Sequence, residues 1–72
     1  MNRDGHLTHP LIGRLVRDRD SGTEGLLMAV VREDVPTLVG PRRTAKRAYI
    51  RPTGGGREIA TALNRIDPLG VA

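Results

Sequence analysis

The supply of core-forming side chains is the feature that most constrains this chain. It has 72 residues, it lacks Phe, Trp and Cys, and Tyr49 is its only aromatic residue. Any hydrophobic core must therefore be built from aliphatic side chains and Met, without disulfide bonds. Ordering a chain of this length costs about 1.5 kcal/mol per residue. We therefore expect one domain with a small layered core and a net stability of a few kcal/mol.

A core of this size also argues against an enzyme. Pockets that bind small molecules take about 300–1,000 Å³, and a domain this small has little interior to spare. Nucleophilic catalysis needs a base held beside a hydroxyl or thiol group. Ser21 is the only serine, and it stands in a predicted turn without a histidine nearby in sequence. We assign no catalytic residue, no cofactor and no small-molecule substrate.

The apolar segments are too short for a membrane protein. The longest apolar run covers residues 26–31, which is six residues, whereas a membrane-spanning helix needs about 20. Residues 1–6 have no apolar stretch after the charged residues, so a secretory signal is not expected. Apolar residues make up 38% and charged residues 28% of the chain, which favours a globular protein. Together these features predict a cytoplasmic protein.

Short apolar segments between turn-forming residues predict an all-β fold. The strongest strand covers residues 23–31. Leu26, Met28 and Val30 should face one way in it. Both of its faces are apolar, so this strand should be central and bent. Ala48 and Ile50 should point inward from a later strand. The full expected order is a flexible arm over residues 1–10, strand 11–17 with a bulge or close packing at Gly13, turn 18–22, strand 23–31, connection 32–43, strand 44–51, turn 52–56, return strand 57–61, helical turn 62–65, last strand 66–69 and tail 70–72.

Two segments permit a second interpretation. Residues 58–66 could form a helix, because Ile59, Leu63 and Ile66 recur at helical spacing. Within the long connection, Leu38 and Val39 could form a short apolar edge strand.

Part of the sequence resembles a known class of small barrel. Residues 12–18 carry a glycine before a short apolar segment that ends in Asp18, a polar turn with Ser21 and Gly22 follows, and Gly25 opens the next apolar strand. This opening resembles the Tudor and KOW modules, which are barrels of the Src-homology-3 (SH3) type, and the tail from Ile59 to Leu69 is similar to their last strand and helical turn. The whole also resembles small β proteins of unassigned function that are common in actinobacteria.

The resemblance implies a single five-stranded SH3-like barrel over residues 11–69. KOW-like barrels bind nucleic acids or partners associated with ribosomes and polymerases, and this is the role that the resemblance implies. A methyl-lysine cage needs several aromatic residues around the cation, and a proline-binding groove needs a row of them. With Tyr49 alone, both of these functions are excluded.

Positive charge is concentrated in the second half of the chain. Residues 1–36 contain five arginines and six acids, a net charge of −1, whereas residues 37–72 contain seven basic and two acidic residues, a net charge of +5. Guanidinium groups neutralise phosphates, and an exposed tyrosine can stack on a base. Arg47, Tyr49 and Arg51 alternate on the outward side of a predicted strand. The candidate nucleic-acid-binding residues are Arg42, Arg43, Lys46, Arg47, Tyr49, Arg51 and Arg57.

The other motifs are weaker. His6 and His9 have a spacing that can hold a metal on a helix, but Pro10 follows and the segment is expected to be mobile, so no metal site is assigned. The triple glycine before Arg57 lacks the lysine and the spacing of a P-loop, so a hairpin turn is the better interpretation. The acids could form a rim opposite the basic face, or be ordinary turn charges. These acids are Asp18, Asp20, Glu24, Glu33 and Asp34.

The sequence therefore predicts a small non-enzymatic module that binds DNA or RNA through a basic strand face. The alternative is a protein-interaction or accessory module, which binds a partner or dimerises through the apolar edge at Leu38 and Val39.

Overall fold

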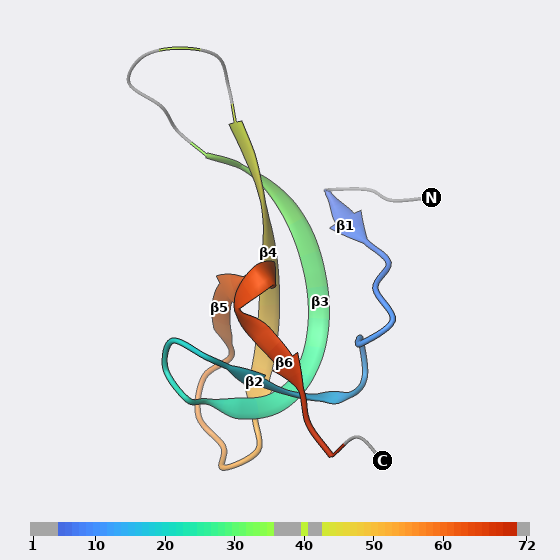
Figure 1. The fold of residues 1–72 in the computed structure, drawn as a ribbon, viewed down its shortest axis with the longest axis vertical. Coiled ribbons are helices and arrows are strands. Elements are labelled where there is room, and N and C mark those ends of the chain that lie inside the picture. Colours follow the sequence, from blue (N-terminus) through green and yellow to red (C-terminus); the bar gives the residue numbers. More distant parts are fainter. Residues whose placement is uncertain (1–4, 36–39, 41–42, 71–72) are drawn as a thin grey trace.

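The chain folds into a single antiparallel sheet (Figure 1). A computed structural model describes residues 5–35, 40 and 43–70. Among these residues, no helix is long and apolar enough to cross a membrane. The all-β prediction is confirmed. The elements are β1 (His6–Leu7), β2 (Leu15–Asp18), β3 (Glu24–Val35), β4 (Arg43–Pro52), β5 (Ile59–Ala62), the 3-10 turn η1 (Leu63–Arg65) and β6 (Ile66–Pro68).

The strand order is β5-β4-β3-β2-β6, and β1 pairs with β3 outside this path. Strands β3 and β4 form a long hairpin, and β5 returns along β4 as the sequence predicted. The sheet curls but its two end strands, β5 and β6, do not pair with each other, so the sheet is open. Residues 58–66 contain the whole of β5, η1 and the start of β6, so the helical alternative for this segment is wrong.

The central strand β3 bends at a β-bulge. Leu27 pairs with Ile50 and Ala29 pairs with Tyr49, so Met28 is an extra residue without a partner on β4. A bulge of this kind increases the local twist and resets the alternation of side chains. Leu27 and Val30 are therefore both buried, although simple alternation assigned them to opposite faces. Met28 is 37% exposed and shares the outer surface with Leu26.

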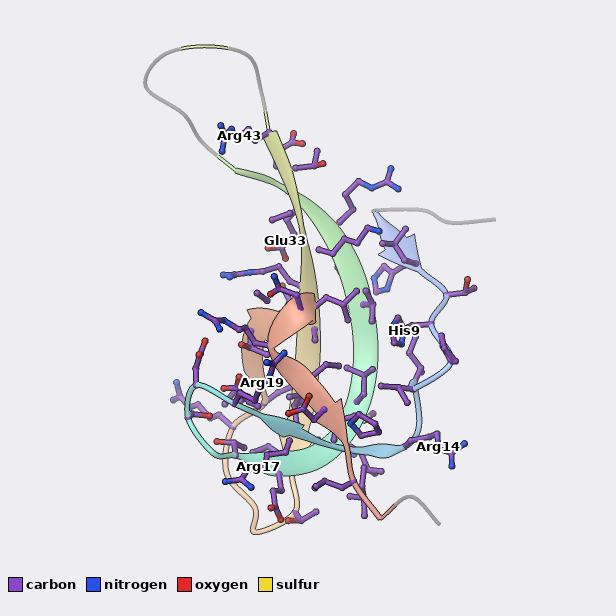
Figure 2. The ribbon with its side chains drawn as sticks, viewed as in Figure 1. His9, Arg14, Arg17, Arg19, Glu33 and Arg43 are labelled. Atoms are coloured by element: carbon purple, nitrogen blue, oxygen red, sulfur yellow. The ribbon has the colours of Figure 1, made fainter. Side chains whose placement is uncertain are left out.

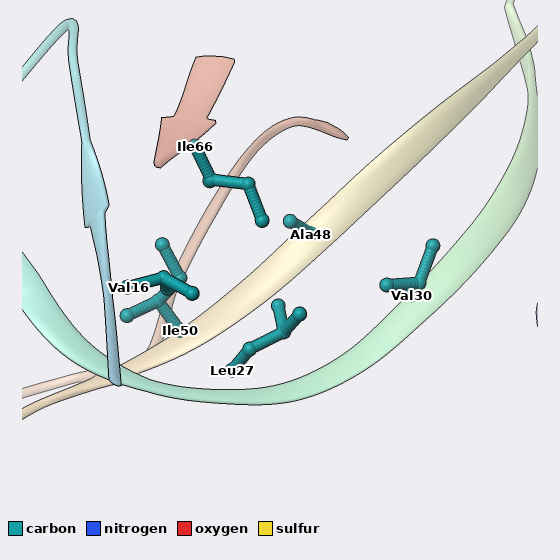
Figure 3. Packing of buried hydrophobic residues seen from close by; sticks show 6 residues of the cluster. All are labelled: Val16, Leu27, Val30, Ala48, Ile50 and Ile66. Atoms are coloured by element: carbon teal, nitrogen blue, oxygen red, sulfur yellow. The ribbon is translucent and has the colours of Figure 1, made fainter. Parts of the chain in front are cut away.

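The core lies inside the curl of the sheet (Figure 3). Leu27 and Val30 from β3 meet Ala48 and Ile50 from β4, so the predicted inward side of β4 is confirmed. Val16 from β2 and Ile66 from β6 complete the cluster. Four partly buried residues pack around it, namely Leu7, Leu11, Ile59 and Leu63.

Gly25 lets β3 approach β4 closely. A Cβ atom at this position would lie 2.0 Å from the backbone oxygen of Arg51, which is closer than Cβ atoms come to other heavy atoms in folded proteins. Gly13 differs, because nothing lies within 4 Å of its Cβ position and its φ is +85°. The sequence suggested a bulge or close packing at Gly13. Instead, glycine is favoured there because the turn needs a positive φ.

Three expected segment boundaries were wrong. Residues 1–10 were expected to form an arm, but within that segment His6 and Leu7 pair with Val31 and Val30 of β3. The strand expected over residues 11–17 is β2, and it starts only at Leu15, because residues 10–13 form a turn. Residues 32–35 were expected in a connection, but they continue β3, because each pairs with a residue of β4. Pairing across the hairpin outweighs the weak strand preference of Glu33 and Asp34.

Side chains join β2 to the far end of the sheet. Asp18, at the end of β2, is 3% exposed. Its carboxylate accepts hydrogen bonds from the Oγ1 of Thr61 on β5 at 2.9 Å and from the Oγ of Ser21 at 2.7 Å. Arg19 forms an ion pair with Asp67, with 3.3 Å between Nε and Oδ2. We call residues 18–23 together with residues 61–67 the clasp.

Burial and hydrogen bonding act in opposite directions on Asp18. Burial would raise the pKa of its carboxyl group, but hydrogen bonds from the side chains of Ser21 and Thr61 and from the backbone N–H groups of Asp20 and Ser21 outweigh it. The pKa of Asp18 therefore lies below its ordinary value of 3.8. The charged form is stabilised in the folded state.

The opposite end of the β3–β4 hairpin extends beyond the core. We call residues 32–35 of β3 and residues 43–46 of β4 the hairpin arm. None of the side chains that the structure describes in the hairpin arm is buried. Its geometry is fixed by pairing between the two strands rather than by packing.

Candidate nucleic-acid interface

The outer face of β4 carries three of the predicted basic residues. Side chains alternate along a strand, and Ala48 and Ile50 point into the core. Arg43, Arg47 and Arg51 therefore share the opposite face, and all three are exposed. Successive arginines in this row are four residues apart, which is about 13 Å along a strand. We call Arg43, Arg47, Tyr49 and Arg51 the basic row.

Glu33 of β3 binds two members of the basic row. Its Oε1 lies 3.4 Å from the Nε of Arg47, and its Oε2 accepts a hydrogen bond from the hydroxyl group of Tyr49. Glu33 pairs with Ala45 in the hairpin, four residues from Tyr49 on β4, so the tyrosine ring must run along the strand to reach it. The ring is half-buried, and its hydroxyl group is bound by Glu33. Sequence patterns do not reveal this arrangement, because it depends on the register of β3 against β4.

The same contact perturbs Tyr49. The hydrogen bond to Glu33 raises the pKa of the Tyr49 hydroxyl above its ordinary value of 10.0, and burial and the charge of Glu33 act in the same direction. The phenol therefore stays protonated and continues to donate to Glu33 at neutral pH. The ion pair between Arg47 and Glu33 contributes little to stability, because both side chains are more than one third exposed to water.

The remaining candidates are Lys46, Arg57 and Arg42, and Lys46 does not share this face. Lys46 lies on the opposite side of β4, in the same alternation as Ala48, and it stands directly across from Arg32 of β3. Arg57 follows the glycine-rich turn and precedes β5. Arg42 lies outside the described residues, as do Leu38 and Val39 of the alternative apolar edge. Figure 2 shows Arg43 at the loop end of β4 and Arg14 beside β2.

Of the two alternatives for the acids, the contacts of Glu33, Asp18 and Asp20 favour ordinary local charges over a rim. Glu33 lies on the basic face itself, where it binds Arg47 and Tyr49. Asp18 is buried in the clasp. Asp20 binds a basic residue there, with 3.6 Å from the Nε of Arg65 to its Oδ1. The acids are distributed according to local contacts, so they do not form a second surface.

Two other motifs have structural roles. The Nδ1 atom of His9 accepts a hydrogen bond from the backbone N–H of Leu11 at 3.1 Å, which supports the turn before β2. Residues 53–56 form the turn between β4 and β5, as predicted, and Gly55 and Gly56 have φ values of 91° and 99°. Among the residues that the structure describes, no three side chains of His, Asp or Glu gather into a group that could hold a metal ion.

The exposed guanidinium groups of the basic row can attract phosphate groups. The exposed guanidinium groups of Arg43 and Arg51 form no ion pair with any other described residue. Arg47 is partly neutralised by Glu33, and the acidic Glu58 also acts electrostatically on Tyr49. Comparisons of this chain with protein-family models, curated proteins and solved structures find no significant match.

Proposed function

We propose that this chain is a small non-enzymatic module that binds nucleic acid through the basic row. The alignment of Arg43, Arg47 and Arg51 on one face of an uninterrupted strand carries the proposal. Their side chains would contact phosphates at intervals along one nucleic-acid strand, and the half-buried ring of Tyr49 would lie beside Arg47. Attraction of this kind is mostly electrostatic and falls with salt concentration.

The proposal includes an SH3-like barrel as the scaffold. Several features support it. The strand order is β6-β2-β3-β4-β5, the bulge bends β3 strongly, and a 3-10 turn separates β5 from β6. The hydrogen bond between Thr61 and Asp18 would close the barrel where backbone pairing is absent. Such a scaffold would hold β4 rigid and keep the basic row in a line.

Substitution of Arg51 by Ala tests the role of the basic row. We expect the variant to bind a fluorescein-labelled single-stranded oligonucleotide about fivefold more weakly at low ionic strength. The slope of log affinity against log salt should fall by about 0.7, because one phosphate contact is lost. The matched control is Arg14→Ala, which removes the same charge from an exposed residue beside β2. Its affinity should change less than twofold.

Equal effects of the two substitutions would show that only the overall charge of the protein matters, and the basic row would be rejected as a site. Absence of any salt-dependent binding by the wild-type protein would reject the function itself. Oligonucleotides of RNA, single-stranded DNA and duplex DNA, tested in parallel, would identify the preferred nucleic acid.

A further inference from the structure

A second surface lies where β5 ends beside β4. Strand β5 pairs with residues 47–50 of β4, and its last residue, Ala62, lies opposite Arg47. The chain then turns away into η1. Strand β4 continues through residues 44–46, where it pairs with β3 on one side only. On the other side, residues 44–46 form no backbone hydrogen bond with any described residue.

This free edge faces a concavity of about 590 Å³ that is open to solvent. Its volume is within the range of protein binding sites, about 300–1,000 Å³. We call it the edge notch. It is lined by Thr44, Ala45, Lys46, Ala62, Leu63 and Asn64.

The backbone of β4 supplies the directional part of the edge notch. Residues of a strand alternate in the side toward which they direct their N–H and C=O groups. Within residues 44–46, at least one residue must therefore direct both groups toward the edge notch. Unpaired backbone groups at a sheet edge are a template for an added strand. Proteins use such edges to bind extended peptides, in which backbone bonds give affinity and side chains give specificity.

The side chains around the edge notch favour an acidic occupant. Lys46 lines it, and Arg32 stands directly opposite Lys46 on β3. Like charges in directly opposed positions repel each other, and neither side chain forms an ion pair with another described residue. Asp34, two residues along β3 from Arg32, already has a partner of its own. A carboxylate from outside the chain would relieve the repulsion between Lys46 and Arg32.

The small and apolar lining residues define the other half of the pattern. Ala45 and Ala62 leave room for a side chain from an added strand, and Leu63 provides an apolar contact. An added strand would place acidic side chains near Lys46 and apolar side chains near these residues. A peptide with acidic and apolar residues in alternation has this pattern.

We propose that the edge notch is a docking site for an acidic peptide segment in extended conformation, which joins the sheet as a strand beside residues 44–46 of β4. The charged part of this site is separate from the basic row, because Lys46 lies on the other face of β4 from Arg47. The peptide would continue the position that β5 occupies beside residues 47–50.

Peptides of defined charge test the proposal directly. The probe is a fluorescein-labelled decapeptide of alternating Val and Glu, and the matched peptide alternates Val and Lys. Binding is measured by fluorescence anisotropy with the full chain. We expect the Val–Glu peptide to bind at least tenfold more tightly than the Val–Lys peptide. Analogues of the Val–Glu peptide that are N-methylated at alternate residues, in each of the two phases, test the backbone bonds. At least one phase should bind at least tenfold more weakly.

Variants of the protein locate the site. Lys46→Glu should weaken binding of the Val–Glu peptide at least tenfold, whereas Arg14→Glu, which changes the charge equally beside β2, should weaken it threefold or less. Amide chemical shifts of the bound protein should change at residues 44–46 and 63–64. Circular dichroism would show whether both variants are folded. If one variant is unfolded, the chemical-shift changes in the wild-type protein serve as the test.

Three results would overturn the proposal. These are absence of binding by the Val–Glu peptide, binding of both N-methylated analogues as tight as that of the unmodified peptide, and shift changes confined to residues 47–51. Oligonucleotide binding is measured on the same variants. Loss of peptide binding with retention of oligonucleotide binding in Lys46→Glu would separate this site from the basic row, so each proposal can fail without the other.

Discussion

The clasp and the hairpin arm are opposite solutions to the same problem of holding strands together with few apolar residues. In the clasp, a buried carboxylate and ion pairs connect segments that are up to 48 residues apart in sequence, from Arg19 to Asp67. In the hairpin arm, two strands hold each other mainly by backbone pairing, and none of their described side chains is buried. The clasp therefore should determine stability, whereas the hairpin arm can carry exposed charges for binding at little cost to the fold.

The largest effect is expected near the clasp, where β3 meets β4. In Gly25→Ala, the new methyl group would overlap the backbone oxygen of Arg51, and backbone atoms cannot move aside easily. Overpacking of this kind costs about 1–3 kcal/mol, and we expect a value near the upper end. Urea denaturation would measure it.

The matched control is Gly54→Ala, since nothing lies within 4 Å of the Cβ position and its φ is not positive. It should change the free energy of unfolding by less than about 0.5 kcal/mol. Equal losses in the two variants would show that β3 and β4 are not as closely packed as described.

A smaller effect is expected from the buried carboxylate of the clasp. Asp18→Asn should lower the free energy of unfolding at pH 7 by about 1–3 kcal/mol, because hydrogen bonds to a buried charged acceptor are lost or weakened. The pKa of Asp18 is lower in the folded state than its ordinary value of 3.8. Its contribution is therefore present above that value and is lost as the pH falls through the folded-state pKa.

Thermal unfolding measured between pH 2 and pH 7 checks both parts of this prediction. Wild type should lose stability below about pH 4, and Asp18→Asn should lose less over the same interval. Asp67→Asn serves as the control, because its carboxylate is 53% exposed and pairs only at the surface with Arg19. If wild type and Asp18→Asn lost the same amount of stability at acid pH, the role assigned to the clasp would be contradicted.

The smallest effect on stability is expected in the hairpin arm. Glu33→Gln removes the charge that pairs with Arg47 and accepts from Tyr49, yet exposed ion pairs contribute at most about 1 kcal/mol. The pKa of the Tyr49 hydroxyl should fall toward its ordinary value of 10.0. In wild type, the raised pKa means that the contribution of this contact is complete below pH 10 and is lost as the pH rises through the folded-state pKa.

Ultraviolet titration of the single tyrosine measures that shift. Tyr49 is the only aromatic residue, so the signal needs no assignment. Arg47→Ala is a useful companion, because Arg47 lowers the pKa of Tyr49 and its removal should shift the titration upward. An unchanged titration in Glu33→Gln would show that Tyr49 does not donate to Glu33 in solution.

Local patterns were sufficient for most elements but not for their contacts. Alternation placed Ala48 and Ile50 in the core, and turn-forming residues placed the hairpin between β4 and β5 correctly. The extent of β3 was missed, because Glu33 and Asp34 have weak strand preference by themselves and become strand only through pairing with Ala45 and Thr44. In the candidate site, the residues on the outward side of β4 were predicted, but the hydrogen bond from Tyr49 to Glu33 was not.

The sequence by itself determined that this chain is built from strands with an aliphatic core, because alternation and turn chemistry act between near neighbours along the chain. Only the tertiary structure decided that Met28 is an extra residue, so that both Leu27 and Val30 are buried. It also decided that Glu33 lies on the basic face and that β5 ends before residues 44–46 of β4. These features depend on which residues of distant strands stand opposite each other, and that register is set by the packing of the whole sheet.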